Sequence, residues 1–172
     1  MRKPELESAL QARFMNIAQE IEGIDESLFF APIGEKWSIA ENLLHLTQSA
    51  KVLNQALAMP KDVLITQFKK LERPIMEYDE IVSNYLAVLA TGLKARGAFV
   101  PVLPENPSKE MLLNSFMKHH KTLVNYLNEF SEIELDQVTI PHPVLKLLST
   151  REMYYFMYYH LEHHQKAIHR AM

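Results

Sequence analysis

Apolar side chains recur at helical spacing in five long segments of the chain. Between Pro4 and Glu22 they fall at Leu6, Leu10, Phe14, Ile17 and Ile21. The other segments span residues 38–59, 76–94, 108–130 and from about Ser149 or Thr150 to the C-terminus, and none alternates with period two. Spacing near 3.6 residues places the apolar side chains on one face of an α-helix. The pattern predicts an all-α bundle of four core helices without a sheet, with one additional helix in the connection between core helices 2 and 3.

The ends of these helices are marked by polar residues and prolines. Ser38, followed three residues later by Glu41, forms a capping-box pattern, and SKEM and STRE mark the starts of two later helices. Pro60 ends the second helix. The segment from Lys61 to Pro74 has no clear period, so we expect it to be irregular, and the three prolines of VPVLPENP indicate a connection.

Composition narrows the class of protein and the chemistry it can use. At 172 residues with 48% hydrophobic content, residues 1–172 are expected to form a single domain. No apolar run approaches a membrane span and the N-terminus is polar, so we expect a cytoplasmic protein without a membrane partner. The absence of cysteine leaves His, Asp and Glu as the metal-ligating side chains. The net charge of −3 and the scattered Lys and Arg predict that nucleic acid is not a partner.

Histidines are concentrated in the last helix, in the stretch YYHLEHHQKAIH. On a helical wheel, His160 and His164 fall in the middle of the apolar face, whereas His163 lies on its flank and His169 faces water. Two imidazoles four residues apart point the same way and can hold one ion. This spacing predicts a metal site that needs a further ligand from another helix.

Two histidines are candidates for that ligand. His45 lies about 120° from the centre of its apolar stripe, which is acceptable if its helix is covered on two sides. His120 lies within its stripe, beside Phe116 and Leu123. Periodicity alone leaves both open. We expect His119, His142 and His169 to be exposed and without a role, and Trp37 to pack at the start of the second helix.

Two blocks of the sequence resemble the DinB superfamily. The first is KWSIAENLLHLTQSAKVL, and the second is PHPVLKLLSTREMYYFMYYHLEHHQKAI, which contains His142-Pro143 and the series His160, His164, Gln165. The chain reads Val144-Leu145-Lys146 where that family commonly has a glycine after the His-Pro pair. The resemblance implies a four-helix bundle of DinB type that binds Zn²⁺ or Ni²⁺ through His45, His160 and His164.

The resemblance also implies an activity. An ion held by three neutral imidazoles keeps its charge and an open position, where it can activate water or a thiol. We therefore expect a metal-dependent enzyme, a thiol transferase or hydrolase in detoxification, acting on a small molecule with a low-molecular-weight thiol. The alternative is a non-catalytic stress-response or interaction protein with a structural or vacant His site.

Two further expectations concern the surroundings of the site and the assembly. We expect Glu41, one turn before His45, to orient that imidazole. Apolar residues beyond those that four amphipathic helices need predict a homodimer, and they are Leu44, Tyr154, Tyr155 and Tyr158.

Overall fold

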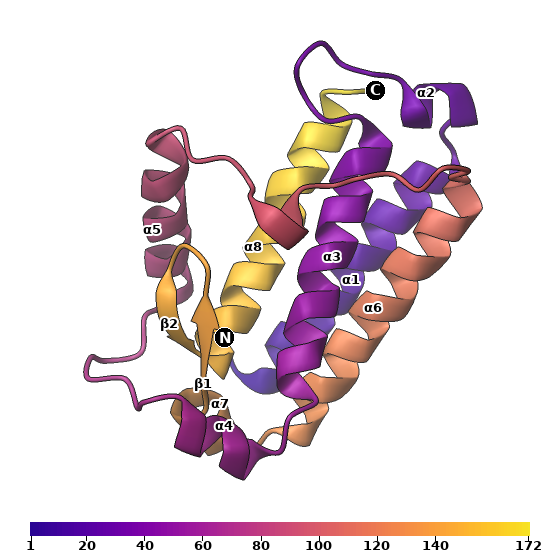
Figure 1. Ribbon diagram of the computed structural model, residues 1–172. Helices are drawn as coiled ribbons and strands as arrows, with labels where there is room; N and C mark the ends of the chain where they lie inside the picture. The colour runs from indigo at the N-terminus through magenta and orange to yellow at the C-terminus, as the bar shows by residue number, and fades with distance from the viewer.

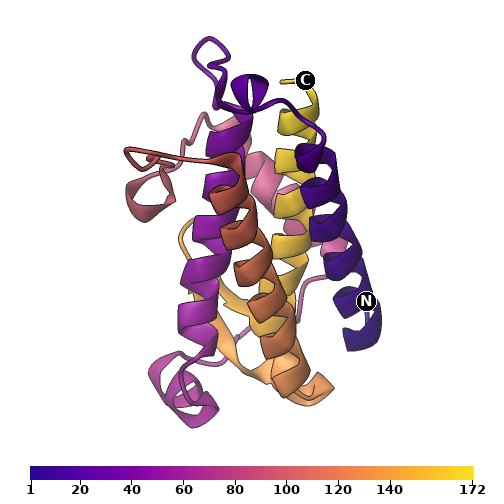
Figure 2. The ribbon, with the colours of Figure 1, turned by 90° about the vertical axis from the view of Figure 1, so that its right-hand side faces the viewer.

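Four long helices pack around a shared apolar core in the computed structural model, which describes residues 1–172 (Figure 1). They are α1 (Lys3–Glu22), α3 (Ile39–Leu57), α6 (Lys109–Glu129) and α8 (Thr150–His169). Helices α1 and α3 each pack against both α6 and α8. Figure 2 shows α3 and α6 side by side on the near face of the bundle. The predicted four-helix bundle is confirmed.

The additional helix predicted between core helices 2 and 3 is α5 (Tyr78–Ala90), which packs against α8. The chain then crosses the bundle through the short 3₁₀ turn η1 (Gly97–Phe99), which lies against α3 and precedes α6 (Figure 1). Helix α2 (Glu26–Phe30) also packs on α3. Helix α3 is therefore covered on several sides, which explains how His45 is buried despite lying away from the centre of its apolar stripe.

The apolar positions of the first helix that are predicted to face the core are buried in the structure. The five positions that define the first predicted helix are all 0–2% exposed, and they join a core cluster of 36 buried hydrophobic residues. The predicted capping box is also present, since Ser38 Oγ accepts from the Glu41 amide and the Glu41 carboxylate accepts from the Ser38 amide. Ser149 and Glu152 form the same reciprocal pair at the start of α8.

The prediction of an irregular segment after Pro60 is wrong in its first half, because Lys61–Gln67 forms helix α4. This helix has seven residues and one fully buried side chain, Leu64, on which it rests. A single apolar anchor over two turns gives no measurable period, and for that reason the sequence pattern did not reveal the helix.

The prediction of no sheet is also wrong. After α7 (Glu132–Gln137), strands β1 (Thr139–His142) and β2 (Lys146–Ser149) form an antiparallel hairpin in which Ile140 pairs with Leu148 and His142 with Lys146. Each strand has only four residues and β1 contains Pro141, so a period of two is not visible in the sequence. Lys146 has a φ of 66°, in the left-handed region that favours glycine, at a turn where the DinB pattern commonly has glycine.

The structure also corrects the expectation for His142, which is 8% exposed rather than at the surface. Its Nδ1 accepts hydrogen bonds from the amides of Val144 and Leu145, so the imidazole shapes the hairpin turn. Burial lowers the pKa of His142 to about 4. This side chain is a neutral structural acceptor.

Two of the residues that suggested a homodimer are buried within the chain itself. Tyr154 is 0% and Tyr155 is 2% exposed, and Tyr154 donates to the Leu123 carbonyl. They no longer support a dimer interface, and the homodimer stays a prediction. No helix is both long and apolar enough to cross a bilayer.

Candidate metal centre

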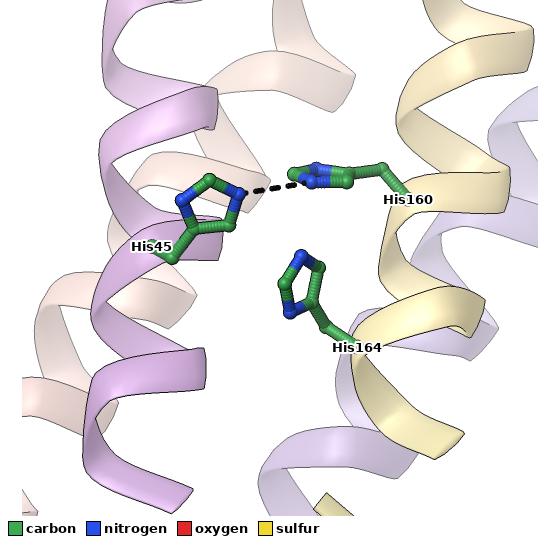
Figure 3. Close-up of side chains that lie close together, drawn as sticks. All are labelled: His45, His160 and His164. Atoms are coloured by element: carbon green, nitrogen blue, oxygen red, sulfur yellow. Dashed lines mark hydrogen bonds between the residues drawn. The ribbon is translucent and has the colours of Figure 1, made fainter. Parts of the chain in front are cut away.

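Three histidines from two helices converge inside the bundle (Figure 3). His45 comes from α3, and His160 and His164 come from successive turns of α8. One ring nitrogen from each lies within 4.8 Å of the others, and His45 Nε2 is 3.1 Å from His160 Nε2. Two nitrogens that share a tetrahedral Zn²⁺ at its usual bond length lie about 3.3 Å apart. The cluster has the donor set and the spacing that could bind a metal.

The other histidines lie outside this cluster. His120, the alternative to His45, packs beside Phe14 and Phe116, with ring centroids 5.8 and 4.2 Å away, and its Nδ1 donates to the Phe116 carbonyl. His163 flanks the cluster, and His169 is an exposed partner of Glu20. The wheel and the DinB pattern together therefore selected the three histidines that the structure brings together.

All three imidazoles are buried and held neutral. Their exposures are 7% for His45, 2% for His160 and 6% for His164. Burial is the main cause that lowers the pKa of each imidazole, well below the usual range for His160 and His164, and the neighbouring imidazoles add to this. A neutral imidazole keeps the lone pair that a metal ion requires.

The orientation of His164 is fixed by Asn42. Both hydrogens of the Asn42 amide are committed to backbone carbonyls, those of Trp37 at 3.2 Å and Ser38 at 2.9 Å. The Asn42 Oδ1 atom must therefore face His164, 2.8 Å from its Nδ1. His164 consequently carries its proton on Nδ1 and leaves the lone pair of Nε2 free.

His45 is oriented in the same way by a backbone carbonyl. Its Nδ1 donates to the Phe99 carbonyl at 2.7 Å, because a carbonyl oxygen can only accept. The Nε2 lone pair of His45 therefore accepts from His160 Nε2 at 3.1 Å, which leaves the buried Nδ1 of His160 without a hydrogen-bond partner. A cation bound by both Nε2 atoms would take the place of the proton that they share, because ligating imidazoles give up that proton when a metal binds.

The expectation that Glu41 orients His45 finds no contact in the structure. The Glu41 carboxylate accepts from the amide and hydroxyl of Ser38 at the helix start. The Phe99 carbonyl takes the orienting role, and it comes from a turn 54 residues away that no local sequence pattern could assign. The role of Asn42 left one signal in the sequence, a polar residue directly before Leu43 and Leu44. In the structure its side chain is only 4% exposed.

Aromatic side chains cover the three histidines. The Trp37 ring lies 4.9 Å from His45 and is stacked at 6.0 Å on His164. Phe156 is stacked on His160 at 5.0 Å, and Tyr85 of α5 meets the same imidazole edge-on at 6.2 Å. Trp37 thus covers the cluster, in addition to the packing role expected at the start of its helix.

Comparisons with known proteins agree with this architecture. The sequence model of the DinB superfamily matches residues 8–168. A search of curated proteins finds no match. Among solved structures, the colibactin self-resistance protein ClbS in complex with a double-stranded DNA is similar over 98% of this chain and 94% of its own, with a TM-score of 0.60 and 17% identity.

The likeness to ClbS corrects two predictions. The expectation of a metal-dependent thiol transferase or hydrolase is contradicted by this likeness, since the similar fold belongs to a self-resistance protein that is bound to DNA. The exclusion of nucleic acid as a partner is wrong for the same reason. It rested on net charge and on the scatter of Lys and Arg along the sequence, and neither reports how the charges are distributed over the folded surface.

Proposed function

This chain belongs to the DinB superfamily, and from that premise we propose that it is a non-catalytic DNA-binding protein of the stress-response type, stapled internally by one divalent metal ion. The observation that carries the proposal is the burial of the three-histidine cluster. Its members are 2–7% exposed and lie beneath Trp37, Phe156 and the η1 turn. A substrate would have to displace these groups, whereas an ion that only joins α3 to α8 requires no access.

The ion is Zn²⁺ or Ni²⁺ in this proposal. Imidazole suits both ions, and the chain has no cysteine to favour a softer one. The ion would be held by His45, His160 and His164, while Asn42 and the Phe99 carbonyl keep two of the rings in the ligating tautomer. Carbonyl and amide partners of this kind orient metal ligands in many proteins.

Removing the metal and adding it back tests whether the ion stabilises the fold. Chelated protein should stay helical, because the apolar core is independent of the cluster. An ion at 100 times its dissociation constant should add about 2.7 kcal/mol to the free energy of unfolding. For a chain of this length that is a rise of roughly 5–10 °C in Tm. If neither ion raises Tm and elemental analysis finds no metal, the proposed stabilising ion is refuted.

The position of Asn42 gives a more specific prediction. Asn42→Ala removes the only acceptor shown for His164 Nδ1, so the ring is free to rotate or to exchange its tautomer. Loss of such a partner typically weakens metal binding 10–100-fold. Calorimetric titration of Zn²⁺ into chelated protein measures this. Asn54→Ala is the matched control, because Asn54 is a buried asparagine of the same helix that donates to the His119 carbonyl instead. Equal affinities in the two variants would contradict the role of Asn42.

Duplex DNA is the proposed partner, and the double-stranded DNA in the ClbS structure supports it. Wild-type protein should raise the fluorescence anisotropy of a labelled 20-base-pair duplex at low salt, with no turnover of electrophiles in the presence of small thiols. Absence of DNA binding would overturn the partner, and thiol-dependent turnover would overturn the non-catalytic assignment.

We further propose that residues 1–172 unfold as one domain. The cytoplasmic location stays a prediction.

A further inference from the structure

Two adjacent helices of the bundle each contain a long stretch that has basic side chains and no acidic ones. Between Asn42 and Leu57 of α3, and between Met111 and Asn128 of α6, the chain contains Lys51, Lys118 and Lys121 but no Asp or Glu. All 21 acidic residues therefore lie in other parts of the chain, together with 15 of the 18 basic residues. The net charge of −3 conceals a local excess of positive charge on these two stretches.

The three lysines are exposed and free of ion pairs. None of the salt bridges in the structure includes Lys51, Lys118 or Lys121. By contrast, Lys61, Lys166, Arg73 and Arg151 are each paired with a carboxylate of the chain. Unpaired ammonium groups can neutralise the charges of an external anion without first breaking an internal bond.

Lys51 of α3 and Lys118 of α6 lie near the contact between the two helices. The two helices are the near pair in Figure 2, and Asn54 of α3 donates to the His119 carbonyl of α6 at 2.9 Å. Partial burial lowers the pKa of the half-buried His119, and the charges of Lys118 and Lys51 lower it further. The ammonium groups of Lys51 and Lys118 therefore both lie near His119, although they come from different helices.

Several polar, uncharged side chains lie on the same face of α6 as Lys118. On a wheel of α6 with Lys118 at the centre, Thr122 lies about 40° to one side, and Asn125 and Asn114 lie about 20° and 40° to the other. Hydroxyl and amide side chains of this kind bond phosphate oxygens in protein–DNA complexes. A surface that binds a membrane would instead need an apolar face, and the only large hydrophobic residues exposed on these two spans are Val52 and Met111.

We propose that the α3–α6 face, centred on Lys51, Lys118 and Lys121, binds the phosphate backbone of duplex DNA. The proposal rests on DNA being the partner and adds where it binds. Three ammonium groups neutralise about three phosphates, so the binding is independent of base sequence and weak at physiological salt. The logarithm of the association constant should fall with the logarithm of salt concentration with a slope of about −3.

The test is the triple variant Lys51→Glu, Lys118→Glu, Lys121→Glu, measured by anisotropy with a 20-base-pair duplex between 25 and 150 mM salt, about the range where such contacts are strong. We expect at least a tenfold loss of affinity at the lowest salt and a salt slope close to zero. Circular dichroism and Tm confirm that the variant is folded, which its exposed positions favour.

The matched control is Lys69→Glu, Lys70→Glu, Lys146→Glu, which makes the same change of net charge at exposed, unpaired lysines outside α3 and α6. It should change affinity less than threefold. If both triple variants lose affinity equally, the loss is an effect of total charge. DNA then remains the partner, but the assignment of its binding site to the α3–α6 face is wrong. If wild-type protein does not bind DNA, the proposed partner fails as well. Binding to phosphatidylglycerol vesicles that is tighter than to DNA and lost in the first variant would assign the face to a membrane instead.

Discussion

Alanine in place of His160 should abolish binding of Zn²⁺ while the protein stays helical. His160 is the central member of the cluster, 3.1 Å from His45 by Nε2 and one helical turn from His164. Loss of an outer partner alone weakens metal sites 10–100-fold, so removal of a ligand should weaken this one by more than about 100-fold. The 36-residue apolar core does not include His160, and we expect the far-ultraviolet circular dichroism of the variant to match that of wild type.

His163→Ala is the matched control for this variant. His163 is a histidine of the same helix, three residues further on, and its ring lies 5.2 Å from that of His164 without joining the cluster. Titration of Zn²⁺ into the two chelated variants should give no binding for His160→Ala and nearly wild-type affinity for His163→Ala. Loss of binding in His163→Ala, with binding kept in His160→Ala, would show that the ion uses a different set of ligands.

The sequence was most informative where a helix is long. Four core helices, their caps and the additional α5 follow from apolar periodicity and capping patterns that span many residues. Helix α4 and the β1–β2 hairpin were not predicted because each has only one or two buried apolar side chains, Leu64 in α4 and Ile140 with Leu148 in the hairpin, and these are too few to define a period.

The candidate site was likewise predictable within one helix but not between helices. His160 and His164 could be paired from the wheel, since they belong to one helix. His45 could be chosen over His120 only through the DinB resemblance, because the burial of His45 depends on η1 and α2 covering α3, a tertiary arrangement that periodicity does not contain. The Phe99 carbonyl is a backbone group, so no choice of side chain in the sequence marks it.

Net charge was the least reliable guide. It averaged the acid-free stretches of α3 and α6 with the acidic remainder of the chain, and so it favoured the exclusion of nucleic acid. The distribution becomes visible only when Lys51 and Lys118 are placed on adjacent helices. Charge therefore has to be counted by surface before a partner is excluded.

The remaining buried histidine, His120, should make the protein sensitive to acid. Its side chain is 1% exposed beside Phe14 and Phe116, and its Nε2 has no hydrogen-bond partner. Burial lowers the pKa of His120 to about 4, against 6.5 for an ordinary histidine. Between these two values the unfolded chain binds a proton that the folded protein does not, so the free energy of unfolding falls as the pH falls from 6.5 toward 4.

His120→Leu should remove this part of the acid sensitivity. The linkage amounts to ~2 kcal/mol between pH 7 and pH 4.5. Leucine is close to histidine in volume and leaves no polar atom unpaired in this apolar place, so stability at pH 7 should be equal or higher. Urea unfolding of both proteins at pH 7 and pH 4.5 gives the difference directly. Metal-free protein is used, so that protonation of the three-histidine cluster contributes equally to both.

His119→Leu, at the next position of α6, is the control for the His120 prediction. Partial burial and the charges of Lys118 and Lys51 lower the pKa of His119, but its ring is half-buried, so its replacement should remove a smaller part of the acid sensitivity. The expected order of stability lost between pH 7 and pH 4.5 is therefore His120→Leu least, His119→Leu next and wild type most. If His120→Leu loses as much stability as wild type, His120 takes up its proton within the folded bundle, and the apolar packing around it is looser than its 1% exposure indicates.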